Sequence, residues 1–143
     1  MMRALLFCSA TVAILTTSIP AQSDAAAFAP ILTDAQAKAA NQDYDGALLV
    51  LDKGAEKLSG HAPFRYYRGL YSLEYARQAI AKKKSVGLID GLFADAKNNL
   101  AKAVELDGAM IAARLRLAEA FAESGDAAKG AAAAEAALSQ LAT

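Results

Sequence analysis

The stretches DAKNNLAKAVELDG (residues 95–108) and GAAAAEAALSQLAT (residues 130–143) carry the same pattern. Their small residues recur 34 positions apart, Ala96 with Gly130 and Ala103 with Ala137. A period of this length, with small residues at fixed offsets, is typical of stacked helix-turn-helix arrays. Because such arrays usually bind other proteins, the spacing predicts a class of function as well as a fold.

The N-terminus has the order of a secretory signal peptide. Arg3 precedes an apolar run over residues 4–18, and small residues follow. This order predicts a signal peptide over residues 1–23, with cleavage after Ser23 favoured over Ala21. The run is shorter than the roughly 20 residues that cross a bilayer, so we expect no stable membrane insertion after cleavage. The protein is expected to be periplasmic or secreted.

Composition excludes several classes of function. The chain has 15 basic and 15 acidic residues, and losing Arg3 with the signal leaves no basic surplus to attract nucleic acid. Cys8 is the single cysteine and lies in the signal, so the mature chain has no thiol chemistry and no disulfide. Much of the 55% hydrophobic content is alanine, which favours close-packed helices with thin interfaces.

Periodicity beyond the signal is helical throughout, and no strand-like alternation of any length occurs. The sequence therefore predicts an all-α fold of about six helices. Residues Ser85–Gly87 are expected to end the helix over residues 63–83, and Asp90 is expected to cap the helix that follows. The predicted helices cover residues 29–41, 45–58, 63–83, 90–108 and 110–123, and a last segment after the Ser124–Asp126 turn.

The third repeat unit carries the clearest resemblance to a known family. Its small, aromatic and glycine residues are similar in spacing to those of the tetratricopeptide repeat family: Ala118, Phe121, Gly125, Gly130 and Ala137. The turn DYDGA (residues 43–47) resembles that family's entry to a second helix. The resemblance implies a right-handed superhelical array of antiparallel helix pairs.

The resemblance divides the chain into three repeats, at residues 28–61, 62–110 and 111–143. The second is irregular, since Gly69 lies 27 residues before Ala96, about 15 more than the family uses. An insertion is therefore expected near residues 79–93. The repeats are degenerate, because charged residues replace apolar ones at Asp34, Arg65, Arg68 and Arg114.

In that family, the first helix of each repeat lines a concave groove. The resemblance therefore implies a groove that is apolar with an acidic end, made of Leu32, Gln36, Tyr66, Leu70, Leu73, Glu74, Leu115, Glu119, Ala122 and Glu123. The Lys and Asn residues that clamp a C-terminal carboxylate in one subclass are replaced here. We expect the partner to be an extended or helical protein segment with apolar anchors and some positive charge.

A tyrosine stripe, Tyr67, Tyr71 and Tyr75, runs along the predicted helix over residues 63–83. Tyrosine favours binding sites, but the stripe also fits the interior of the second repeat. If it binds, a small molecule or glycan held between this helix and the inserted segment is the alternative function.

No catalytic constellation stands out. His61, the single histidine, is expected to be a solvated loop residue, and no residues suggest a metal site. The glycines of SVGLIDGLF (residues 85–93) lack the Lys and Ser/Thr of a phosphate-binding loop. The protein is therefore expected to be no enzyme and to need no cofactor. An exported tetratricopeptide-repeat adaptor for protein–protein interaction in the cell envelope is the predicted function.

Two further features allow two interpretations each. The lysine run Lys82–Lys84 suits an acidic partner or an anionic membrane, or simply a solvated helix end. Arrays normally finish with a polar capping helix, and none follows the last predicted helix. Leu138 and Leu141 are thus expected either to mediate self-association or to be tolerated by solvent.

Overall fold

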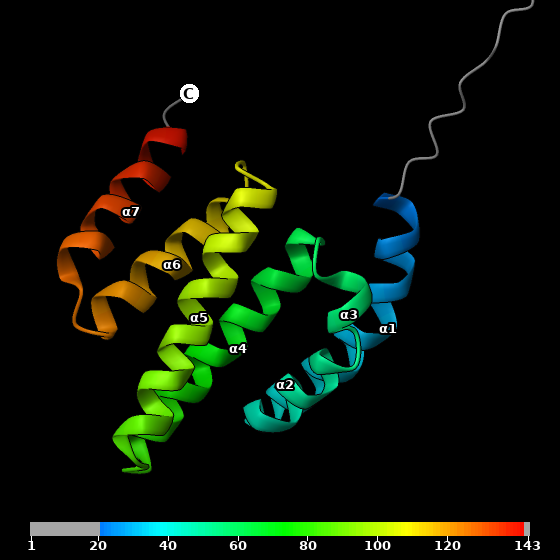
Figure 1. The fold of residues 1–143 in the computed structure, drawn as a ribbon, viewed down its shortest axis with the longest axis horizontal. Helices are drawn as coiled ribbons and strands as arrows, with labels where there is room; N and C mark the ends of the chain where they lie inside the picture. The colour runs from blue at the N-terminus through cyan, green and yellow to red at the C-terminus, as the bar shows by residue number, and fades with distance from the viewer. Residues whose placement is uncertain (1–20, 142–143) are drawn as a thin grey trace, which may run out of the picture.

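The computed structural model describes residues 21–141, and every regular element there is an α-helix (Figure 1). The all-α class is confirmed, although the described residues form seven helices rather than about six. The helices are α1 (Ala21–Ala40), α2 (Tyr44–Asp52), α3 (Ala55–Leu58), α4 (Ala62–Ala81), α5 (Val86–Leu106), α6 (Ile111–Glu123) and α7 (Ala127–Leu141).

Helices pack chiefly against their neighbours in sequence. The pairs α1–α2, α4–α5 and α6–α7 make the main contacts, and α2–α4 and α5–α6 join these pairs into a row. Figure 1 shows the row running from α1 on one side of the molecule to α7 on the other. This helical repeat-like architecture leaves each pair in contact with its neighbours alone. Helices α4 and α6 begin at Ala62 and Ile111, where the second and third repeats were predicted to start.

Small residues lie where paired helices approach most closely. Ala96 and Ala103 of α5 are fully buried, and Ala118 of α6 is nearly so. A Cβ atom on Gly69 of α4 would lie 3.0 Å from the Leu100 amide nitrogen and 3.1 Å from the Ala96 carbonyl oxygen. The backbones of α4 and α5 thus approach so closely at Gly69 that no side chain fits between them.

The core consists of two clusters, one on each side of α4. The first lies between α4, α5 and α6 and contains Leu73, Ala76, Ala79, Leu92, Phe93, Ala96, Leu100 and Ala120. The second lies between α1, α2, α3 and α4 and contains Phe28, Ala35, Ala47, Leu51, Leu58, Phe64 and Tyr71. Helix α4 therefore organises the molecule, since both clusters depend on it.

Residues 79–93, where an insertion was predicted, form the end of α4, a turn and the start of α5, the two longest helices after residue 40. Helix α4 has 20 residues and α5 has 21, against 13 in α6 and 15 in α7. The predicted break is present but lies earlier than predicted, at residues 82–85 rather than 85–87. The predicted cap at Asp90 is wrong, because α5 begins at Val86 and its N-cap is Ser85. Apolar periodicity could not reveal the first turn of α5, since residues 86–88 are exposed.

The predicted helix over residues 45–58 is wrong as a single element. Helix α2 ends at Asp52, and the short helix α3 follows. The amide of Gly54 donates to the Leu51 carbonyl at 2.9 Å. This bond joins residues three apart, as in a 3₁₀-helix, rather than four apart as in an α-helix. After this break, Leu58 lies in the second core cluster, where it is almost fully buried.

Helix α1 begins at Ala21, ahead of the predicted start at residue 29. Its first half carries Phe28, which is buried against α4 residues Phe64 and Tyr67. Of the predicted signal peptide, residues 1–20 lie outside the described residues. Within the described range, none of the helices combines the length and the apolar character needed to cross a membrane.

Two arginines of α4 join three helices through a polar network. Arg65 of α4 donates to Asn99 of α5, with 2.9 Å between Nη1 and Oδ1. Arg68 of α4 pairs with Asp52 at the end of α2, and its Nε lies 3.8 Å from Asp95 Oδ2 on α5. These arginines therefore link α2, α4 and α5 by polar contacts where the family resemblance implied apolar packing.

Candidate partner-binding surface

Arg77 joins α4 to α6 at the predicted acidic end of the groove. Its Nη1 lies 2.6 Å from Glu74 Oε1, and its Nη2 lies 2.7 Å from Glu119 Oε2 and 2.5 Å from Glu123 Oε1. Three predicted groove carboxylates thus surround one guanidinium. The structure brings Glu74, Glu119 and Glu123 together around Arg77.

A second arginine extends this cluster along α6. Arg116 Nη1 lies 2.8 Å from Glu119 Oε2. The pKa of Arg116 is raised, chiefly by its hydrogen bond to Glu119, and the Tyr66 side chain beside it adds a smaller effect. Tyr66 therefore belongs to the same surface as the ion pairs. We call these six residues, together with the exposed Leu115 one turn before Glu119, the α4–α6 face: Tyr66, Glu74, Arg77, Leu115, Arg116, Glu119 and Glu123.

Ion pairing changes the electrostatics predicted for the groove. Burial alone would raise the pKa of Glu119, but hydrogen bonds from Arg77 and Arg116 outweigh it and hold that pKa below its ordinary value. The pKa of Arg77 is raised, mainly by its hydrogen bond to Glu123. With three carboxylates facing two guanidiniums, the acidic end is largely neutralised within the protein.

The remaining predicted groove residues divide by burial. Leu73 is fully buried in the first core cluster, so its assignment to an open groove is wrong. Leu32 and Leu70 are half-buried against the second cluster. Gln36 and Leu115 are exposed, as is Ala122, and Leu115 presents 40% of its surface beside Arg116.

The two arginines of the α4–α6 face, Arg77 and Arg116, were not predicted as part of the groove. A signal was available, because Glu74 and Arg77, and likewise Arg116 and Glu119, are spaced three residues apart on their helices. That spacing places opposite charges on one helix face. It could not show that the two faces meet, since contact between α4 and α6 is a tertiary property.

The tyrosine stripe is buried at Tyr71 and half-buried at Tyr67 and Tyr75. Tyr71 is buried between Tyr44 and Tyr67, with ring centroids 6.4 and 6.0 Å away, and burial raises its pKa to about 12.

The prediction that His61 is a solvated loop residue is wrong, because its ring meets Phe28 edge-on at 5.0 Å and its Nδ1 is buried. That contact depends on α1, which the sequence did not place beside His61.

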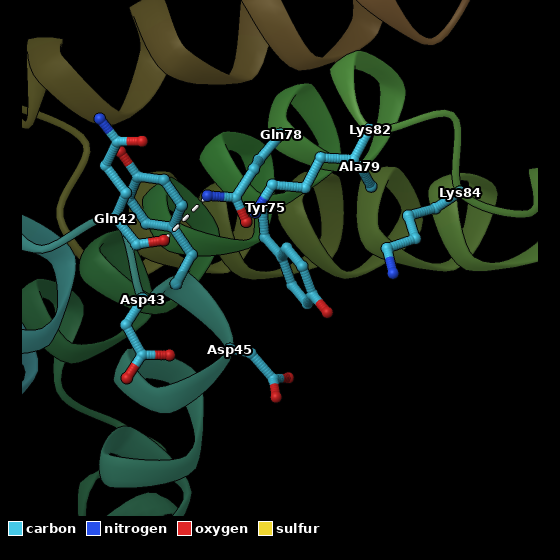
Figure 2. Close-up of a pocket in the computed structure, with 9 residues that line it drawn as sticks. Gln42, Asp43, Asp45, Tyr75, Gln78, Ala79, Lys82 and Lys84 are labelled. Carbon is cyan, nitrogen blue, oxygen red and sulfur yellow. Dashed lines mark hydrogen bonds between the residues drawn. The ribbon is translucent and has the colours of Figure 1, made fainter.

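A cleft of about 240 Å³ lies between the α1–α2 turn and the end of α4 (Figure 2). Gln78 closes one side, donating from Nε2 to the Gln42 carbonyl oxygen at 2.9 Å. Carboxylates come from the α2 side of the cleft and lysines from the end of the α4 side. The lining residues are Gln42, Asp43, Tyr44, Asp45, Tyr75, Gln78, Ala79, Lys82 and Lys84.

Both turns beside this cleft contain a strained residue. Gln42 and Lys83 have φ of 59° and 51°, and they are the non-glycine residues with positive φ among residues 21–141. Each occupies the position after a helix end where glycine is usual, as the Asp43-to-Lys38 and Lys84-to-Ala79 backbone bonds show.

Glycine at either strained position should stabilise the protein. Gln42→Gly and Lys83→Gly are each expected to raise the free energy of unfolding by about 1 kcal/mol, because glycine adopts the left-handed conformation without a Cβ clash. Urea denaturation measures the change. Gly125→Ala is the matched reverse substitution, at φ 91° in the α6–α7 turn, and should destabilise by a similar amount. No gain in either glycine variant would contradict the strain.

The sequence was compared with protein-family models and with curated proteins. The chain matches no protein-family model, and a search of curated proteins gives no match.

Proposed function

We propose that this protein is an exported, periplasmic or secreted, adaptor of the tetratricopeptide-repeat type that binds another protein noncovalently. The observation that carries the proposal is the α4–α6 face. There Tyr66 lies beside Arg116, and Leu115 is exposed on the same helix as Arg116. Neighbouring carboxylates hold the two arginines, Arg77 and Arg116, in place. Tyrosine and arginine are the residue types that most often dominate binding energy at protein interfaces.

Preorganisation supports the choice of this surface. Arg77 and Arg116 share Glu119, so both side chains are restrained before a partner arrives. Restrained side chains lose less conformational entropy on binding. A binding surface built from them needs little rearrangement.

The partner chemistry follows from the paired charges. Because Glu74, Glu119 and Glu123 already face Arg77, positive charge on the partner gains less than an unpaired acidic groove would offer. Apolar contact with Tyr66 and Leu115 then selects the partner. An extended or helical segment with apolar anchors suits that surface.

Photocrosslinking in living cells tests the proposal. A photoreactive amino acid at Leu115 should give a discrete adduct, and one at Leu106 should not. Both leucines are 40% exposed, but Leu106 lies at the end of α5, outside the α4–α6 face. Once the partner is identified, Leu115→Ala should weaken its binding about 10-fold and Leu106→Ala should leave it unchanged. Equal crosslinking at both positions would refute this binding surface.

The second candidate function is binding of a small molecule or glycan. It is favoured by the position of the cleft, which Tyr75 of the tyrosine-rich helix lines together with Lys82 and Lys84 of the inserted segment. Figure 2 shows Tyr75, Gln78 and Lys84 along it. Glycan-array binding that Tyr75→Ala removes and Leu115→Ala leaves intact would support this function over the adaptor.

A further inference from the structure

The closed end of the α4–α5 hairpin is a projecting tip. In Figure 1 it extends past the ends of α2 and α6. Residues 80–88 are all exposed, and three large apolar side chains lie among them: Ile80 at 50%, Val86 at 72% and Leu88 at 37%. We call residues 80–88 the hairpin tip. Solvent exposure of this much aliphatic surface at one point indicates a contact site.

The three lysines of the hairpin tip have no carboxylate partner. None of the ion pairs among residues 21–141 includes Lys82, Lys83 or Lys84. The acidic residues around the hairpin tip, which could in principle pair with these lysines, have other partners or lie elsewhere. Asp43, across the cleft, accepts from the Gly46 amide and pairs with Lys38, while Asp45 lines the cleft's other side and Asp90 lies further along α5.

Backbone geometry fixes these lysines as a group. The Lys83 amide donates to the Ile80 carbonyl and the Lys84 amide to the Ala79 carbonyl, both at 2.9 Å. Val86 then begins α5 directly after the Ser85 cap. Lysines and aliphatic side chains are therefore held together on one short, ordered turn.

We propose that the hairpin tip is a peripheral docking site for an anionic lipid membrane. The cation cluster complements lipid phosphates, and Val86, Ile80 and Leu88 would enter the boundary between headgroups and acyl chains. The convex shape favours a membrane over an acidic protein, because a projecting tip needs a concave partner site on a protein but none on a bilayer. The association is weak and reversible, and it leaves the α4–α6 face free.

Tryptophan reporters test where the membrane contacts the protein. The chain contains no tryptophan, so Val86→Trp and Leu138→Trp give single-reporter proteins. Both sites are well exposed, at 72% and 60%. With vesicles that contain phosphatidylglycerol, the emission of Val86→Trp should shift to shorter wavelength and be quenched by brominated acyl chains. Emission of Leu138→Trp should not change.

Variants that lack lysine charges test whether membrane binding depends on the lysines of the hairpin tip. Lys83→Gln with Lys84→Gln should weaken binding to the same vesicles about 25-fold, since each lysine near an anionic surface contributes about 5-fold. Lys53→Gln with Lys57→Gln is the matched control, because it removes the same charge from exposed positions outside the hairpin tip and should have little effect. All variants share one N-terminus, so any contribution of residues 4–18 is the same in each.

Three results would overturn the proposal. The first is a spectral response of Leu138→Trp equal to that of Val86→Trp. The second is equal loss of binding in the two double-lysine variants. The third is absence of vesicle binding together with binding of an acidic polypeptide such as polyglutamate, which would assign the hairpin tip to a protein partner.

Discussion

Replacing Gly69 with alanine is expected to lower the free energy of unfolding by about 2 kcal/mol. The added methyl group would lie 2.6 Å from Leu100 Cγ, 3.0 Å from the Leu100 nitrogen and 3.1 Å from the Ala96 oxygen. Two of these three atoms are backbone, so relief requires α4 and α5 to separate. Because α4 borders both core clusters, that separation disturbs most of the packed interior.

Gly91→Ala on the facing helix is the control. Gly91 also lies within a helix, but no atom of another element is within 4 Å of its Cβ position. Alanine there should stabilise the protein by about 0.5–1 kcal/mol, because it is the better helix former. Urea denaturation of both variants measures the difference. A neutral or stabilising Gly69→Ala would show that the two helices do not approach as described.

Arg77→Gln is expected to destabilise the protein by about 2 kcal/mol near pH 7, because it leaves carboxylates of two helices facing one another with only Arg116, paired to Glu119, to offset their charge. The affected groups are Glu74, Glu119 and Glu123. All are partly exposed, and solvent screening keeps the effect below that of a fully buried pair. Arg114→Gln is the control, since Arg114 donates only to the Gly108 carbonyl among the described contacts.

The cost of Arg77→Gln should shrink as the pH falls. In the parent protein, the pKa of Glu119 is held below its ordinary value, so its pairing stabilises the fold above that value and is lost as pH falls through the lowered pKa. In the variant, facing carboxylates take up protons more readily, which relieves their repulsion. Unfolding measured between pH 7 and pH 3 should show the two stability curves converging. Parallel curves would contradict the role of these ion pairs.

Much of the fold could be predicted from local pattern. Small residues at Ala96, Ala103 and Ala118 indicated close helix contacts, and each is buried. The Ser124–Asp126 turn was also predicted correctly, with Gly125 at φ 91°. The errors fall where local pattern is weakest. Gly54 lies between α2 and α3, and Leu58 beyond it is almost fully buried. The early start of α5 was not predicted because its exposed first turn carries no apolar periodicity.

The candidate surface could be predicted less well. Tyr66, Glu74, Glu119 and Glu123 were placed on one face through a family resemblance, and their side chains do meet through Arg77 and Arg116. Leu73 was assigned to the same face and is buried. A register predicts which side of a helix a residue occupies, but burial depends on the neighbouring helix and its angle.

The sequence by itself determined the helical class, the small residues at helix contacts and the lysine run, because each depends on spacing along one segment. The tertiary structure alone decided which charges are neutralised and which are free. Glu119 meets Arg77 from another helix, whereas Lys82–Lys84 take part in none of the ion pairs among residues 21–141. Both outcomes depend on distances between segments far apart in the chain, and Coulomb interactions follow those distances rather than the sequence.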